Sequence, residues 1–299
     1  MSNIPNINFA RAEGILKGEL AGDIVFTLVY VPLFFFNVFR SFRHPTYVLI
    51  SLSVFCAIRI AAFGLRAVLA GSDTAGTNVN VVVAQGIIYS VGFFGLLYSA
   101  YTLTLDRLQM TDHNEISGGG PLWLIRKFTR ERRVVRIILI VAVALGITGG
   151  VDSSSTDPSK QSTGESLRRV SVYIFLGISV ALLIVTADLA WDEHQDGTRR
   201  ESEPVGRKYR LIVVAAIALL CLVREAFFAA TSFNTVKQNS AHFFFPLAAL
   251  PEFLAVCFFA APGLVPSRAE LLRRAEAQRN GVEFAELTRA SGNSNYGYA

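Results

Sequence analysis

The stretch SVFCAIRIAAFGLR, residues 53–66, lies inside the apolar run 46–70 and carries two arginines, Arg59 and Arg66. A run of about 20 apolar residues is long enough to cross a bilayer as a helix. An arginine at the centre of the bilayer costs roughly 2.5–3.5 kcal/mol, so such residues face protein and are paired. The stretch therefore predicts a transmembrane helix with one face against polar groups of other helices.

The composition also indicates a membrane protein. The chain has 299 residues, of which 52% are hydrophobic and 17% charged, and its mean hydropathy is +0.43. Soluble domains carry about 25% charged residues. The net charge of +5 comes from loops and the C-terminal segment, so we expect membrane lipids and no nucleic acid as partners.

Seven segments are long and apolar enough to span a membrane, which predicts an all-α, seven-transmembrane helix bundle. One of them, 133–151, is interrupted by Arg136. We divide the chain into an N-terminal segment 1–17, a transmembrane domain 18–265 and a C-terminal tail 266–299. The predicted spans are 18–39, 46–70, 79–105, 133–151, 168–191, 209–232 and 242–265.

The distribution of basic residues predicts the orientation. Outside the spans or at their ends, 18 Lys and Arg residues fall on the side of the C-terminus and 6 on the side of the N-terminus. Because basic loops stay in the cytosol, we expect the N-terminus outside and the C-terminus inside. The outer loop DSSSTDPSKQSTGES, residues 152–166, is typical of a solvated, disordered segment. In the tail, Ser267 and Glu270 have the spacing of a capping box, which predicts a short amphipathic helix on the membrane surface.

The ionisable residues inside the spans are the candidate site. Cys56, Arg59, Phe63 and Arg66 fall on one helical stripe. By depth, we expect Glu252 opposite Arg59, and Glu19 and Asp23 near Arg66. Arg224 and Glu225 are expected to pair with other helices rather than with each other. The predicted ligand-binding residues are Arg59, Arg66, Arg224, Glu225, Glu252 and Asp23.

Two interpretations of these charges stay open. They form either a closed, fully paired tie between helices, or the floor of a cavity that opens outward past Asp23. Three arginines against two deep carboxylates leave one cation for an anionic ligand, unless Asp23 reaches inward. No catalytic residue, cofactor or metal site is predicted. The four histidines lie in or beside loops, without the spacing of metal ligands.

The pattern Cys-x-x-Arg-x-Ala-x-Phe occurs twice, from Cys56 and from Cys221. Both copies run from the inside to the outside in the predicted topology. A parallel duplication, as in some small transporters, places two such segments in equivalent positions. Coincidence stays the alternative, because no other pair of spans matches.

The segments around SVFCAIRIAAFGLR, ITGGVDSSSTDPSKQSTGESLRRVSVYIFL, CLVREAFFAATSF and PEFLAV resemble an uncharacterised seven-transmembrane domain family found mainly in filamentous fungi. The resemblance covers roughly residues 20–265. It implies a fold and a setting only, because that family has no assigned reaction or ligand.

From these observations we expect a multi-pass protein of the plasma membrane or an endomembrane that binds a small amphipathic or anionic ligand. It would act as a receptor-like sensor or a lipid or solute carrier. One alternative is a membrane-embedded, acid-catalysed enzyme of the terpenoid cyclase kind, with Glu252 or Glu225 as the acid. Another is a scaffold without a ligand. The oligomeric state is not predicted by any of these patterns.

Overall fold

The computed structural model describes residues 8–43, 45–108, 131–155, 157–195 and 210–265. Within these ranges the regular elements are all helical, and seven helices are long and apolar enough to cross a membrane. The predicted fold class of an all-helical chain with seven such helices is confirmed. The elements are α1 (Phe9–Ala12), η1 (Lys17–Glu19), α2 (Leu20–Arg43), α3 (Tyr47–Gly71), α4 (Asp73–Gly76), α5 (Val79–Leu108), α7 (Arg132–Asp152), α8 (Pro158–Gln195), α10 (Arg210–Ala230), α11 (Thr235–Asn239), α12 (Ala241–Phe244), η2 (Phe245–Ala249) and α13 (Leu250–Phe259).

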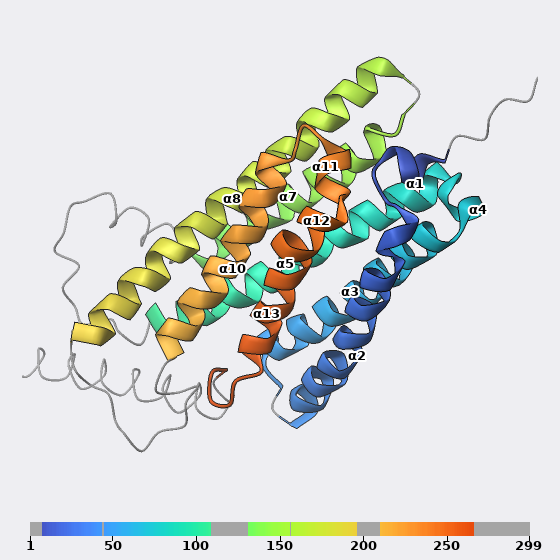
Figure 1. Cartoon of the computed structure of the whole chain (residues 1–299). Helices are drawn as coiled ribbons and strands as arrows, with labels where there is room; N and C mark the ends of the chain where they lie inside the picture. Colours follow the sequence, from blue (N-terminus) through green and yellow to red (C-terminus); the bar gives the residue numbers. More distant parts are fainter. Residues whose placement is uncertain (1–7, 44, 109–130, 156, 196–209, 266–299) are drawn as a thin grey trace, which may run out of the picture.

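The long helices lie side by side in one bundle (Figure 1). In sequence order, α2 packs on α3, α3 on α5, α5 on α7, α7 on α8 and α8 on α10, and α10 in turn packs on α13. The short helices α1, α4 and α11 lie at the same end of the bundle (Figure 1). We call this the outer end, following the predicted orientation.

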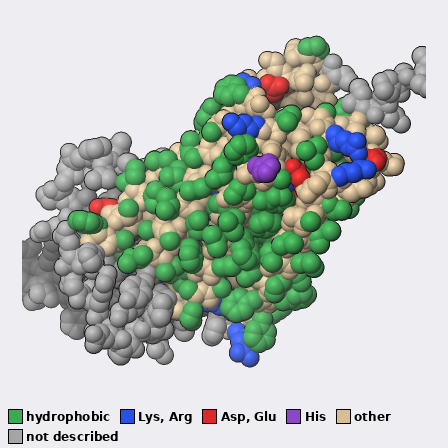
Figure 2. Space-filling view, viewed as in Figure 1, with side chains coloured by type: hydrophobic (Ala, Val, Ile, Leu, Met, Phe, Trp, Pro, Cys, Tyr) green, Lys and Arg blue, Asp and Glu red, His purple; other side chains and the backbone are tan. Residues whose placement is uncertain are grey.

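The surface of the bundle is mostly apolar, as a lipid-facing surface must be. In Figure 2 green side chains cover most of the visible face, and the Lys, Arg, Asp and Glu side chains gather mainly toward the outer end. Helix α2 has the most lipid-like exterior, with large apolar side chains exposed from Ile24 to Phe42. This pattern favours a bilayer rather than water around the middle of the helices.

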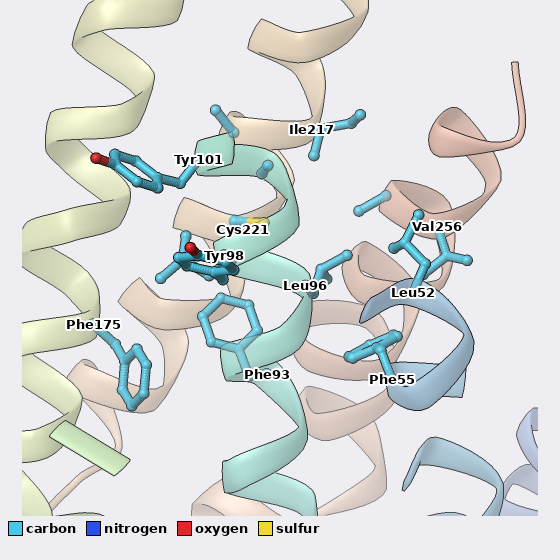
Figure 3. Packing of buried hydrophobic residues seen from close by; sticks show 14 of the residues in the cluster. Leu52, Phe55, Phe93, Leu96, Tyr98, Tyr101, Phe175, Ile217, Cys221 and Val256 are labelled. Atoms are coloured by element: carbon cyan, nitrogen blue, oxygen red, sulfur yellow. The ribbon is translucent and has the colours of Figure 1, made fainter. Parts of the chain in front are cut away.

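The core packs apolar side chains from several helices. Phe55 of α3, Phe93 of α5 and Phe175 of α8 belong to one buried cluster with Cys221 of α10 and Val256 of α13 (Figure 3). The Phe93 and Phe175 rings meet edge to face at 5.9 Å. All five side chains are at least nine-tenths buried. This cluster fixes how α3, α5, α10 and α13 face one another, and so it positions the charged residues described below.

The loop predicted at 152–166 is shorter than expected. Helix α8 begins at Pro158, so residues 158–166 are helical and the expectation of a disordered segment is wrong for them. The reason is close packing against α7: a Cβ atom on Gly164 would lie 2.3 Å from the backbone nitrogen of Ser153. The two helices approach this closely because glycine has no side chain.

The last span is not a regular helix. Residues Phe245–Ala249 form a π-helical turn between α12 and α13, and Pro246 and Pro251 lie in or just after this turn. A proline removes one backbone hydrogen bond, which favours such an irregularity. The regular helix ends at Phe259, short of the predicted end at 265. The predicted tail helix after Pro266 lies outside the described residues.

Candidate functional site

The inner cluster consists of Arg59, Arg224, Glu225 and Glu252, from three helices. Arg59 of α3 donates a hydrogen bond from Nη2 to Oε1 of Glu252 at 2.7 Å. Arg224 of α10 donates from Nε to the same oxygen at 3.0 Å. The four side chains are between 0% and 4% exposed. The expected pairing of Arg59 with Glu252 is therefore present.

Other groups complete the inner cluster. Arg59 donates a second hydrogen bond, to the backbone oxygen of Tyr89 at 2.6 Å, and the Tyr89 hydroxyl donates to Oε2 of Glu252 at 3.4 Å. Arg224 Nη1 is hydrogen-bonded to Oε1 of Glu225, its neighbour in the sequence. Our expectation that these two neighbours do not pair with each other is wrong. Long side chains on adjacent residues can still meet when both turn into one buried space.

The outer cluster consists of Arg66, Glu19 and Asp23. Arg66 donates from Nη2 to Oε2 of Glu19 at 2.7 Å, and its Nε lies 3.2 Å from Oδ1 of Asp23. It also donates to the backbone oxygen of Asn239 at 2.7 Å. The second oxygen of Glu19 accepts a hydrogen bond from the backbone N–H of Ala241 at 2.8 Å. The outer cluster thus ties α2 and α3 to the segment that leads into the last span.

Aromatic rings connect the two clusters. The guanidinium of Arg66 lies 4.1 Å from the centre of the Phe244 ring, and Phe244 lies 5.1 Å from Tyr89, which in turn lies 4.1 Å from the Arg59 guanidinium. Arg224 lies 4.1 Å from the rings of both Phe93 and Phe228. Cation–π contact of this kind is worth about 2 kcal/mol or more when water is excluded.

The balance of charge depends on whether Asp23 reaches the buried arginines. Arg59 and Arg224 face Glu225 and Glu252, so the inner cluster is neutral when all its groups are ionised. In the outer cluster Arg66 alone faces Glu19 and Asp23. The exception named in the sequence analysis applies: Asp23 reaches inward to Arg66, as Glu19 does, so the described residues of the two clusters leave no surplus cation. The surplus charge is negative.

The expected outward opening past Asp23 is wrong, because this side chain is 0% exposed. The segment that leads into α2 lies at the same end of the bundle. Its residue Gly14 has φ +92°, and a Cβ atom there would lie 2.8 Å from the backbone oxygen of Val236 of α11. The side-chain amide of Asn239 donates to the backbone oxygen of Glu13 at 2.9 Å. The N-terminal segment and α11 therefore hold each other beside Arg66.

Several buried polar atoms in the clusters accept or donate no hydrogen bond within the described part of the chain. They are both carboxylate oxygens of Asp23, Oε2 of Glu225, Nη2 of Arg224 and the Nε atoms of Arg59 and Arg66. Unpaired buried polar groups of this kind are rare in folded proteins. Both clusters therefore retain hydrogen-bonding atoms that no described residue satisfies.

Tyr89, Phe244 and Asn239 take part in these contacts although the sequence patterns did not indicate them. Their roles depend on which helices are neighbours, and a single aromatic or amide residue in an apolar span carries no such information. The described residues also contain no group of three or more His, Cys, Asp or Glu side chains that could hold a metal ion.

One ionic site of the outer end is exposed on the surface. Asp73 of α4 accepts a hydrogen bond from Lys17 at 2.8 Å and pairs with Arg11, and its side chain is 60% exposed. The hydrogen bond from Lys17 and the charge of Arg11 lower the pKa of the Asp73 carboxyl from its usual value. This site ties the N-terminal segment to the loop after α3.

The family described as "domain of unknown function (DUF7702)" matches residues 23–269. The chain belongs to this family. The DUF7702 domain covers all seven long helices except the first residues of α2, and it contains every cluster residue except Glu19. The resemblance to an uncharacterised family is confirmed, while its occurrence in filamentous fungi stays an expectation. No curated protein and no solved structure matches the chain.

Proposed function

We propose that this DUF7702 protein is a receptor-like sensor or a lipid or solute carrier, which binds a small amphipathic or anionic molecule at the inner cluster. The observation that supports the proposal is the position of Glu252. It follows the π-helical turn Phe245–Ala249, and its Oε1 accepts hydrogen bonds from two arginines of two other helices.

An interrupted helix next to buried charge is a recurrent feature of membrane transport proteins. Transporter binding sites lie near mid-membrane at helices whose backbone is broken, and π-helical turns occur frequently at functional sites. Glu252 is the third residue of α13 after this turn. A small change in the turn would therefore move the carboxylate relative to Arg59 and Arg224.

An anionic group would bind here by exchange rather than by addition. The inner cluster already holds two carboxylates and is neutral, so a further anion is favourable only if one carboxylate leaves its arginine. An anionic headgroup would take the place of Glu252 beside Arg59 and Arg224, and the surrounding rings of Tyr89, Phe93 and Phe228 would contact an apolar tail.

The scaffold is the second candidate, since all three buried arginines already have carboxylate partners. The cyclase alternative fits less well. A catalytic acid must carry a proton, whereas Glu252 accepts hydrogen bonds from two guanidinium groups, which stabilise the ionised carboxylate.

Glu252→Gln separates binding from scaffolding. The variant keeps the shape of the side chain and leaves the inner cluster with one surplus cation. The protein in lipid nanodiscs is heated with oleate as an anionic probe, dodecylamine as a cationic probe and dodecyl maltoside as a neutral one. We expect oleate to raise the unfolding temperature of Glu252→Gln, and dodecylamine and dodecyl maltoside to have no such effect.

The control is Glu165→Gln, which removes an exposed carboxylate paired with Arg169 on α8. Its response to the three probes should equal that of the unchanged protein. If oleate stabilises the unchanged protein, Glu252→Gln and Glu165→Gln equally, or none of them, the inner cluster is a structural tie and the scaffold is the correct function.

A further inference from the structure

We propose that the outer cluster is a proton-binding site, and that the proton is held on Asp23. The site is separate from the inner cluster. The proton site does not depend on the proposed function. An effect of the proton on ligand binding does rest on the proposed function.

The surplus negative charge of the outer cluster can be assigned to one residue. Both oxygens of Glu19 are used, one by Nη2 of Arg66 at 2.7 Å and one by the backbone N–H of Ala241 at 2.8 Å. Neither oxygen of Asp23 accepts a hydrogen bond from any described residue, although its Oδ1 lies 3.2 Å from Nε of Arg66. Asp23 is also 0% exposed, so water does not reach it from the surface.

A buried carboxylate in this position needs a cation, and a proton is the cation that fits. The neighbourhood is closely packed: a Cβ atom on Gly22 would lie 2.5 Å from the ring of Phe245. An organic amine needs space beside the carboxylate, and a metal ion such as Ca²⁺ needs about six to eight oxygen ligands. A proton needs neither, and it removes the charge whose burial is costly.

The charged groups around Asp23 come from two elements. Arg66 of α3 attracts the ionised carboxylate, and Glu19 of η1 repels it. Asn239 of α11, which accepts a hydrogen bond from Arg66, and Phe245 of η2, which lies beside Gly22, are neutral. One guanidinium cannot neutralise two carboxylates, so the second negative charge remains for the proton to remove.

The same geometry connects the proton to the inner cluster. With Asp23 neutral, Arg66 is paired with Glu19 alone and is less firmly held on α2. Arg66 lies against Phe244, and Phe244 contacts Tyr89, whose hydroxyl donates a hydrogen bond to Glu252. A shift of Arg66 therefore reaches the inner cluster through two rings. Buried ionisable residues form proton relays of this kind in pumps and transporters.

Infrared spectroscopy of the protein in nanodiscs tests the proposal without any ligand. A protonated carboxyl group shows a C=O stretching band that is absent from a carboxylate. Ester C=O groups of the lipids absorb in the same region, so the band is read in the difference between the spectra of labelled and unlabelled protein, in which the lipid absorption cancels. We expect this band in the unchanged protein at neutral pH, a shift of the band when the protein is made with ¹³C-labelled aspartate, and its loss in Asp23→Asn. Asp73→Asn, which changes an exposed aspartate at the same end, should keep the band.

Glu19→Gln gives a further check. It leaves Arg66 with Asp23 as its only carboxylate, so the charges balance and the band should weaken or vanish. A spectrum of the unchanged protein without the band would overturn the proposal, and so would a band that ¹³C-aspartate does not shift or that persists in Asp23→Asn. Among the described residues Asp23 is the aspartate with a buried side chain, so a band that ¹³C-aspartate shifts indicates Asp23 even where a variant does not fold. Loss of oleate binding would contradict the proposed function and leave the infrared result standing.

Discussion

Arg59 and Arg224 meet at one oxygen atom, Oε1 of Glu252, from different helices. They are also the arginines of the two Cys-x-x-Arg-x-Ala-x-Phe segments, and Cys56 and Cys221 are likewise buried. The repeated pattern therefore has a structural counterpart, since both copies present an arginine to the same acceptor. Whether the copies arose by duplication stays a prediction.

The residue scale gives a double-mutant test. Arg59→Leu leaves the inner cluster with one surplus negative charge, and Glu252→Gln leaves it with one surplus positive charge. We expect Arg59→Leu to insert normally but to lose about 1–3 kcal/mol of stability, because Glu252 keeps Arg224 and Tyr89. Glu252→Gln should cost about 3–5 kcal/mol, because it weakens the partner of two arginines.

The double variant Arg59→Leu, Glu252→Gln restores neutrality, so it should be more stable than the sum of the two single losses predicts. Reversible unfolding in mixed micelles measures all three variants. Strict additivity would show that Arg59 and Glu252 do not interact, contrary to the structure.

Arg59→Leu should also lose the response of the inner cluster to oleate. A full response to oleate in this variant would argue against a role of Arg59 in binding.

At the scale of elements, glycines decide how closely α7 and α8 approach. A Cβ atom on Gly149 would lie 2.6 Å from the backbone nitrogen of Arg168, and one on Gly164 would lie 2.7 Å from the backbone carbon of Asp152. Ser171 of α8 also donates a hydrogen bond to the backbone oxygen of Ala142 of α7 at 2.6 Å. Small residues at such crossings allow backbones to touch, as is common in membrane helices.

Gly164→Ala is therefore expected to destabilise the α7–α8 pair by about 1–3 kcal/mol through overpacking. Gly177→Ala is the matched control in the same helix, because a Cβ atom there meets nothing within 4 Å. It should be neutral or stabilise by up to about 1 kcal/mol, since alanine is the better helix former. Equal effects of the two substitutions on unfolding would mean that the close crossing is not formed.

The N-terminal segment should detach from the bundle in acid. Lys17 and Arg11 hold the pKa of Asp73 below its usual value, so the folded state favours the ionised form. This contribution is fully present above the unfolded pKa of about 4 and is lost as the pH falls through the lower, folded value. Hydrogen exchange of residues 9–19, corrected for the intrinsic rate, should therefore rise toward acid pH.

In Asp73→Asn, residues 9–19 should exchange at every pH as fast as they do in the unchanged protein at acid pH. Asp157 also has a lowered pKa, through hydrogen bonds from Ser159, but it lies at the start of α8. Asp157→Asn should leave the exchange of residues 9–19 unchanged. Slow exchange of this segment in Asp73→Asn would show that the apolar contacts of Ala10 and Ile15 hold it without the ion pairs.

For the whole molecule, the seven long apolar helices of the described residues and their exposed apolar side chains indicate a multi-pass membrane protein, and the predicted orientation rests on the basic residues. Arginines at the end opposite α1 bind the carbonyls of the last helix: Arg40 of α2 donates to the backbone oxygens of Phe259 and Ala260, both at 3.3 Å. At this end, Arg40 thus connects the first long helix, α2, to the C-terminal end of the last, α13.

Cysteine labelling in intact cells tests the orientation. Lys160→Cys places a thiol at the start of α8, and Arg43→Cys places one at the end of α2. A membrane-impermeant maleimide should label Lys160→Cys in intact cells and Arg43→Cys only after permeabilisation. The reverse pattern would place the N-terminus in the cytosol and turn the outer cluster toward the inside. The native cysteines are buried or half-buried within spans, so the unchanged protein is the blank.

The sequence by itself determined the helices and the pairs that depth alone can predict. Apolar runs of sufficient length become helices because the bilayer leaves backbone groups no other partner. A helical stripe with two arginines must find carboxylates at the same depth, and so Arg59 meets Glu252 and Arg66 meets Glu19 and Asp23.

Only the tertiary structure decided how these charges balance. Packing between the helices turns the adjacent side chains of Arg224 and Glu225 into one buried space, gives both oxygens of Glu19 a partner, and leaves the Asp23 carboxylate without a hydrogen bond from any described residue. The close crossing at Gly164 and the π-helical turn before Glu252 likewise depend on neighbours. Periodicity reports depth and face along one helix, whereas contacts between helices depend on side-chain packing that no single span encodes.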